Sequence, residues 1–286
     1  MSARSLAQVV GHSRIDGVVP GVRGQRALPT HELRPVDPFV MLDHIGPETV
    51  GSDFHVDGHP HPHRGFETLT MLFEGRMDHV DSLGNQVALV SGSTQNMVAG
   101  RGIQHGGDMA ADPATGRFHE VQLWVNMPAA RKMIEPSIDN MHGAATPVVD
   151  RGHYRLRVLT GSMSGASSSL ATTQPTAVGR LETSGPGPVV VTGIESHWNA
   201  IVYVLEGSVN IEGSRVDQFQ TAVFANDGDS IELDSNGGAD VLILAGLPIG
   251  EPVAMGGPFV MNTQAEIAQA ERDFAAGLFG EVPAVR

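Results

Sequence analysis

Residues 59–75 read HPHPHRGFETLTMLFEG, which places three alternating histidines just before an apolar run. In a β-strand, residues i and i+2 point to the same face, so His61 and His63 can share one ion while the proline between them faces away. Proline has no backbone N–H, which confines this segment to the start or edge of a strand. Residues 68–73 continue as a β-branched and apolar run, and Gly75 ends it. The pattern predicts two imidazoles side by side at the mouth of a β-structure.

Further short apolar runs follow on both sides of this stretch, separated by glycine- and proline-rich turns. That spacing predicts an all-β sandwich or barrel rather than alternating strands and helices. The loop DSLGN at residues 81–85 predicts a hairpin, and Thr263 with Glu266 forms a capping box that predicts a C-terminal helix. Its apolar stripe is expected to consist of Ile267, Ala270, Phe274, Ala275 and Leu278, and Gly280 is expected to end it. A shorter helix is predicted at 128–133. The predicted strands are residues 68–73, 86–90, 121–125, 189–191, 200–205, 208–211, 221–224 and 240–244.

A weak internal repeat predicts two domains. MLFEG at 71–75 matches YVLEG at 203–207, an offset of 132 residues, and each half of the 286-residue chain has the size of an ordinary domain. We therefore expect one barrel over residues 1–135 and a second over 136–286, which ends in the helix.

Composition excludes several classes of function. The chain has no cysteine, which rules out disulfides, thiolate metal sites and cysteine nucleophiles. The net charge is −14 and no block of basic residues is present, so direct nucleic-acid binding is not expected. No apolar run approaches the roughly 18 residues of a membrane span. The N-terminus lacks the pattern of a signal peptide, so the expected location is the cytoplasm.

A third histidine, His105, follows a glycine-rich turn in GRGIQH at residues 100–105. Glu67 follows the histidine pair at the spacing H-x-H-x3-E. Two histidines on one strand and another on a later strand form the pattern of the cupin barrel, so we expect a metal site of His61, His63 and His105. Imidazole ligands suit Fe, Ni, Mn, Cu and Zn to different degrees, and ligand type alone does not choose among them.

The chain resembles the pirin family at motifs that span almost its whole length in order. These are HPHRGFET at 61–68, LFEG at 72–75, DSLGN at 81–85, AGRGI at 99–103, QLWVN at 122–126, DPF at 37–39 and GPFVMNT at 257–263. The resemblance implies two cupin barrels (double-stranded β-helices, or jelly rolls) in tandem with a few short helices. It also implies a metal in the N-terminal barrel only, an iron-type centre with three histidines and one glutamate.

The fourth ligand does not carry over. Pirins have a glutamate two residues after the third histidine, and Gly107 stands there in this chain. Glu67 is the preferred substitute, Asp108 would face the wrong way in a strand, and His59 alternates onto the face of His61. In the second half, the repeat places Gly193 and Glu195 opposite His61 and His63, and no metal site is expected there. A glutamate restored at position 107 is expected to tighten metal binding.

Three functions stay open. The resemblance implies a quercetin 2,3-dioxygenase that uses one divalent metal, dioxygen and a flavonol, with Glu67 accepting the substrate proton if it is not a ligand. The alternative is a non-catalytic regulatory or metal-dependent binding protein, acting through a protein partner, whose site lost its glutamate at Gly107. The third is a cupin that binds a small polar metabolite with an unusual metal. Gly107 makes metal binding the stronger expectation and catalysis the weaker one.

Overall fold

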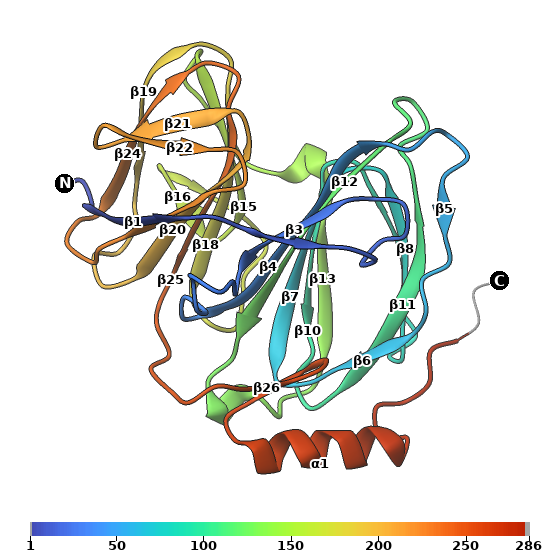
Figure 1. Ribbon diagram of the computed structural model, residues 1–286. Coiled ribbons are helices and arrows are strands. Elements are labelled where there is room, and N and C mark those ends of the chain that lie inside the picture. The colour runs from blue at the N-terminus through green and yellow to red at the C-terminus, as the bar shows by residue number, and fades with distance from the viewer. Residues whose placement is uncertain (1, 284–286) are drawn as a thin grey trace. The chain divides into compact units, whose positions relative to one another are not determined.

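The computed structural model describes residues 2–283 and divides into two compact units (Figure 1). The 145–248 unit consists of Ala145–Pro248, the N-terminal segment that ends at Arg14, and Gln25–Met41. The 42–144 unit consists of Leu42–Ala144, Ile15–Gly24 and the C-terminal segment that begins at Ile249. Both are built almost entirely of antiparallel strands, so the predicted all-β class is confirmed. No helix among residues 2–283 is long and apolar enough to cross a membrane.

The 42–144 unit holds two sheets. Its larger sheet runs in the order β13 (Ser137–Met141), β10 (Ser93–Val98), β7 (Phe66–Glu74), β12 (Arg117–Asn126) and β4 (Phe39–Thr49). Its smaller sheet runs in the order β5 (His55–Val56), β11 (Ile103–Ala110), β8 (Arg76–Asp81) and β9 (Gln86–Val90), and β6 (His61–His63) also pairs with β11. Two 3-10 helices, Ala129–Arg131 and Gly143–Ala145, also lie in this range. The first coincides with the shorter helix predicted at 128–133.

The alternation of side chains along β12 separates an apolar face from a polar one. Val121, Leu123 and Val125 are fully buried on one face. Glu120 and Gln122, on the opposite face, line a cavity inside the unit. The loop at 81–85 joins β8 to β9 as predicted, with positive φ at its glycine.

The C-terminal segment of the chain adds a hairpin and a helix to the 42–144 unit. The hairpin is β26 (Ala254–Gly256) with β27 (Phe259–Met261), and the helix is α1 (Gln264–Ala275). The predicted capping box is present: Thr263 accepts a hydrogen bond from the Glu266 backbone N–H, and the Glu266 side chain bonds back to the Thr263 N–H. Ile267 and Ala270 are buried as expected.

The end of α1 differs from the prediction. The helix ends at Ala275 rather than at Gly280, and the side chain of Leu278 is 65% exposed. Phe279 is buried instead, packed edge-on against Phe259. The helical period breaks at the turn after Ala275, so the apolar side chains beyond it no longer fall on the predicted stripe.

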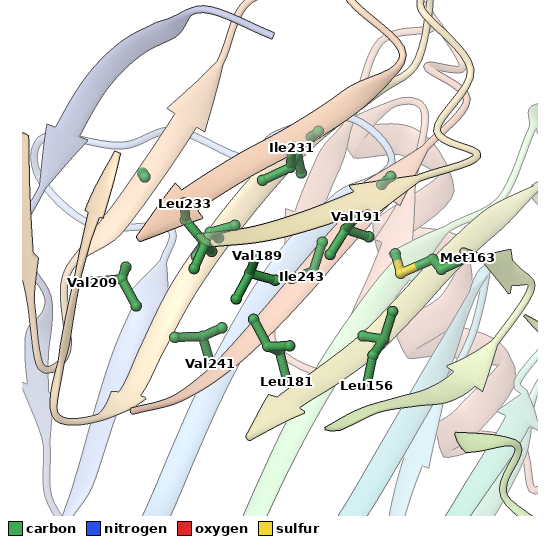
Figure 2. Close-up of a cluster of buried hydrophobic side chains, with 14 of the residues drawn as sticks. Leu156, Met163, Leu181, Val189, Val191, Val209, Ile231, Leu233, Val241 and Ile243 are labelled. Atoms are coloured by element: carbon green, nitrogen blue, oxygen red, sulfur yellow. The ribbon is translucent and has the colours of Figure 1, made fainter. Parts of the chain in front are cut away.

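The 145–248 unit is a second pair of sheets around an apolar interior. Figure 2 shows its buried side chains, which include Leu156, Leu181, Val191, Ile231 and Ile243. One sheet has the order β1 (Leu6–Val10), β23 (Thr221–Phe224), β20 (Asn199–Glu206), β25 (Asp240–Gly246), β18 (Thr176–Thr183), β15 (Tyr154–Thr160) and β14 (Val148–Asp150). The other has the order β19 (Pro186–Thr192), β24 (Ser230–Asn236), β21 (Ser208–Ile211) and β22 (Ser214–Asp217). A small hairpin joins β16 (Ser162–Met163) to β17 (Ala166–Ser167).

The compact units do not follow the predicted ranges 1–135 and 136–286. The strand β1, in the first range, pairs with β23 of the 145–248 unit. The helix α1, in the second range, belongs to the 42–144 unit. The chain also forms β3 (Gly24–Leu28) and β2 (Ser13–Ile15), which follow β4 in the strand order of its sheet. A repeat locates the centre of each barrel, but strands that complete a sheet can come from anywhere in the chain.

Candidate metal centre

His61, His63 and His105 meet at the mouth of the 42–144 unit. Strand β6 carries the first two and pairs with β11, so His61 lies directly opposite His105 in the register. Ring centroids are 4.8 Å apart for His61 and His63, 4.3 Å for His61 and His105, and 5.0 Å for His63 and His105. One ring nitrogen from each of the three lies within 4.8 Å of the others, a spacing that could hold one metal ion.

Hydrogen bonds select which ring nitrogen faces the shared space. His63 Nδ1 lies 3.1 Å from the carbonyl oxygen of Pro258, and His61 Nδ1 lies 3.1 Å from that of His59. A carbonyl only accepts, so each Nδ1 carries the proton and each Nε2 has a free lone pair. The Nε2 atoms of His63 and His105 are buried and have no hydrogen-bond partner within residues 2–283. Buried polar atoms without partners are costly, and a bound metal ion would satisfy both.

Burial keeps these imidazoles neutral. Desolvation and then the neighbouring His61 lower the pKa of His63 to about 3. Desolvation and then the surrounding histidines also hold the pKa of His105 well below its usual range. Since a metal ligand must be deprotonated, both rings are ready to bind at neutral pH without losing a proton first.

Aromatic packing fixes the ring of His63. Phe66 and Trp124 lie edge-on to it, with ring centroids 5.1 and 5.3 Å away. Both aromatic side chains are buried, as expected of barrel core.

A cavity of about 450 Å³ runs from His61 and His105 into the unit. Its walls come from both sheets: His61 and His105 on one side, Thr70, Gln95 and Gln122 on the other. Ile45, Met77, Leu89 and Met109 are among the apolar residues that also line it. This volume falls in the range of small-molecule sites.

The structure does not place Glu67 at this site, contrary to the sequence-based expectation. Phe66 and Thr70 face the interior from β7, so Glu67, one residue out of phase, faces the other way. Its side chain is fully buried and accepts a hydrogen bond of 2.9 Å from Asn96 Nδ2. Within residues 2–283 it is neither in the cavity lining nor in the ligand cluster. The cupin spacing could not reveal this because it fixes sequence distance and not the face of the strand.

Gly107 lies in β11 at a point where the backbone excludes a side chain. Its φ is +134°, and a Cβ added there would overlap the carbonyl oxygen of Asp78 on the paired strand β8. Position 107 is therefore committed to glycine by its backbone, and the carboxylate ligand cannot be restored by a side chain alone.

The two other substitutes considered from the sequence also lie outside the triad. Asp108 instead joins His55 and Asp57 in a separate cluster of exposed or half-exposed side chains. The His59 side chain lines the cavity but is not among the three clustered ligands.

Two ionisable groups in the cavity were not predicted from the sequence. His79 is buried, donates from Nε2 to the Asp81 carboxylate at 3.2 Å, and has its ring centroid 5.4 Å from that of His105. Glu120 is only 4% exposed and lines the cavity from β12. In the sequence, Glu120 alternates with the apolar Val121, which predicts that Glu120 lies on the polar face of its strand. A polar face normally points to solvent. Only the closed barrel shows that this one points inward.

Arg64 has a structural role. Its Nε donates to the carbonyl oxygen of Arg101 at 2.6 Å, and its guanidinium pairs with Asp273 of α1 at 2.7 Å. It also lies over the Phe279 ring, 4.6 Å from the centroid. Arg101 itself pairs with the exposed Glu135.

Comparison with known proteins agrees with this geometry. The family model named Pirin matches residues 21–125, and the Pirin C-terminal cupin domain matches residues 186–280. A pirin-like protein of Caulobacter vibrioides is 37% identical over 98% of this chain and 100% of its own length. Human pirin is 33% identical over 96% of this chain and 92% of its own length.

Among solved structures, a quercetin 2,3-dioxygenase from Acinetobacter baumannii superposes with a TM-score of 0.89 and 28% identity, covering 98% of this chain and 99% of that one. The prediction of two cupin domains is confirmed by these matches. The chain belongs to the pirin family.

Proposed function

We propose that the protein is a metal-dependent dioxygenase of the quercetin 2,3-dioxygenase type. The observation that carries this proposal is the pair of buried, partnerless Nε2 atoms of His63 and His105, beside His61, at one end of a small-molecule cavity. The structural likeness to a quercetin 2,3-dioxygenase supports the choice of reaction. Iron is the ion we propose first; nickel, manganese, copper and zinc are also served by imidazole ligands.

In this proposal, the three Nε2 atoms hold one divalent ion. A bound ion would lower the pKa of a coordinated hydroxyl and template the reaction with dioxygen. The chain's own residues do the rest. The carbonyl of Pro258 fixes the tautomer of His63, and Trp124 and Phe66 fix its ring. With Gly107 in place of a carboxylate ligand, the ion keeps more positions for substrate and is held less tightly.

The cavity favours a neutral substrate. The buried acids Asp43 and Glu120 line it, and no lysine or arginine from residues 2–283 does. A carboxylate or phosphate in such surroundings would be repelled, whereas phenolic hydroxyl groups can donate to them. A flavonol is neutral and carries several such donors, with aromatic rings for the apolar walls.

The experiment is oxygen uptake with quercetin, using protein stripped of metal and reloaded separately with Fe, Ni, Mn, Cu and Zn. We expect uptake with at least one ion, proportional to bound metal. No uptake with any of the ions contradicts the dioxygenase proposal.

A second candidate function is a metal-dependent binding protein without catalysis. The observation that favours it is the backbone at Gly107, which excludes the glutamate ligand of the family pattern. Stoichiometric metal binding without oxygen uptake would support this function over the first.

A further inference from the structure

Glu120 is an ionisable group of the cavity for which the metal centre provides no role. It lies on β12, is 4% exposed, and faces the cavity from the sheet opposite the histidines. It is also outside the cluster of metal-ligating atoms formed by His61, His63 and His105. A buried carboxyl group is costly to ionise, and such groups are concentrated at functional sites.

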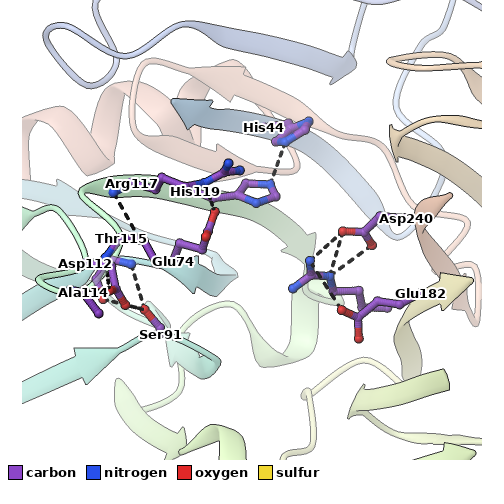
Figure 3. A network of polar contacts seen from close by, with 12 residues as sticks. His44, Glu74, Ser91, Asp112, Ala114, Thr115, Arg117, His119, Glu182 and Asp240 are labelled. Atoms are coloured by element: carbon purple, nitrogen blue, oxygen red, sulfur yellow. Dashed lines mark hydrogen bonds and ion pairs between the residues drawn. The ribbon is translucent and has the colours of Figure 1, made fainter. Parts of the chain in front are cut away.

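Asp43 lies beside Glu120. Strands β4 and β12 are neighbours, and on their outer face His44 Nε2 lies 2.9 Å from His119 Nε2 (Figure 3). His44 directly follows Asp43, and His119 directly precedes Glu120. Because side chains alternate between the two faces of a strand, Asp43 and Glu120 lie together on the face opposite the two histidines. Both acids line the cavity, and Asp43 is likewise 4% exposed.

Two carboxyl groups this close and this buried cannot both be ionised at little cost. Burial, and then the charge of Asp43, raise the pKa of Glu120 to about 7. The other titratable groups around the same cavity are His59 and His61 before or on β6, His79 and Asp78 on β8, His105 and Asp108 on β11, and Asp57. No lysine or arginine from residues 2–283 is among them.

We propose that Glu120, paired with Asp43, is the proton acceptor of this site, and that its substrate is a neutral aromatic carrying an acidic hydroxyl group. This rests on the proposed function for the metal half of the site. The substrate O–H bond breaks, its proton forms an O–H bond on the Glu120 carboxylate, and the electron pair stays on the substrate oxygen as an anion next to the three imidazoles. No oxidant enters this step.

The test compares the wild type with Glu120→Gln and with Glu74→Gln as a matched control. Glu74 is on the neighbouring strand β7, and its carboxylate pairs with Arg117 outside the cavity lining. Metal-loaded proteins are titrated with quercetin without oxygen from pH 5 to 9, and the visible absorption reports whether bound quercetin is protonated or anionic. Metal content and aerobic oxygen uptake are measured on the same samples.

We expect Glu120→Gln to keep its full metal content and to bind quercetin in the protonated form over a range at least one pH unit wider than wild type. Its oxygen uptake should fall about 100-fold, the usual loss when a general base is removed. Glu74→Gln should match the wild type in all three measurements. If Glu120→Gln yields anionic quercetin over the same pH range as wild type, the proposal is wrong.

A second measurement separates this proposal from the proposed function. Infrared difference spectra of the metal-free protein should show a protonated carboxyl band that is lost near pH 7 in wild type and absent in Glu120→Gln. A missing band in wild type overturns the carboxyl pair even if oxygen uptake is observed. A band that is present while uptake fails with every metal leaves the pair standing and overturns the dioxygenase.

Discussion

The ring of His61 is the most accessible of the three imidazoles. His61 and His59 are both exposed and lie two residues apart, yet only His61 has a nitrogen in the ligand cluster. His61→Ala should therefore reduce bound metal at least tenfold with little change in stability, because loss of one of three ligands leaves only two imidazoles. His59→Ala should keep the wild-type content. Elemental analysis after dialysis measures both, and equal metal loss in the two variants would contradict the assignment.

Glu120 gives the stability of the protein a defined pH dependence. Its folded pKa of about 7 lies above the ordinary value of 4.5, so the folded state holds the extra proton between these values. The stability from that proton is complete below pH 4.5 and is lost as the pH rises through 7. Glu120→Gln should thus be more stable than wild type at pH 8, by up to about 3 kcal/mol, and much closer to it at pH 4.5. Urea unfolding at the two pH values measures this, and a constant difference between the proteins would refute it.

The backbone at Gly107 prevents a substitution there from restoring the missing carboxylate ligand. The sequence suggested that Gly107→Glu would tighten metal binding, but the positive φ and the overlap with Asp78 apply to any side chain. Gly107→Ala and Gly107→Glu should therefore both lower the free energy of unfolding by about 2 kcal/mol or more. The Gly107→Glu variant should bind metal no more tightly than the Gly107→Ala variant. Urea midpoints and metal content test this. Tighter metal binding by the Gly107→Glu variant than by the Gly107→Ala variant would show that β11 can rearrange to offer a ligand.

At the scale of elements, Arg64 connects the strand of the triad to the C-terminal helix α1. Its ion pair with Asp273 is largely buried, with side chains 6% and 19% exposed, whereas the pair of Arg101 with Glu135 is 55% and 78% exposed. Removing one partner of a buried pair leaves the other charge unsatisfied, and exposed pairs contribute little.

Arg64→Met should therefore cost about 2–4 kcal/mol and expose α1 to protease, while Arg101→Met should cost less than about 1 kcal/mol. Limited proteolysis and urea unfolding of the two variants make the comparison. Equal resistance of α1 in both proteins would mean that the helix is held by its apolar contacts alone.

At the scale of the whole molecule, the N-terminal segment completes the 145–248 unit. Arg4 is 1% exposed, and its guanidinium donates to the carbonyl oxygens of Glu195, Trp198 and Ala225 at 2.6, 2.8 and 3.2 Å. Arg4→Ala should lower the stability of this unit by about 3 kcal/mol, because those buried acceptors lose their donor. Arg215→Ala, which removes an exposed pair with Asp217, should change it by less than about 1 kcal/mol. Urea unfolding distinguishes them, with unchanged metal content expected in both, and equal losses would show that Arg4 does not anchor the segment.

The sequence predicted much of this molecule because alternation and turn chemistry act locally. The strands at 221–224 and 208–211 have the predicted bounds, and the capping box of Thr263 forms as expected. What it could not predict depends on tertiary contacts. The pairing of β1 with β23 joins residues more than 200 positions apart. Whether Glu67 or Glu120 faces the interior depends on how the barrel closes, which a spacing motif does not encode.

The claim on which the rest depends is that His61, His63 and His105 hold one divalent ion, and anomalous X-ray diffraction from crystals of the metal-loaded protein tests it most directly. We expect one strong peak per chain, about 2.0–2.2 Å from the Nε2 atom of each of the three histidines. A peak elsewhere, for example among His55, Asp57 and Asp108, or no peak from protein loaded to stoichiometry, would contradict the claim.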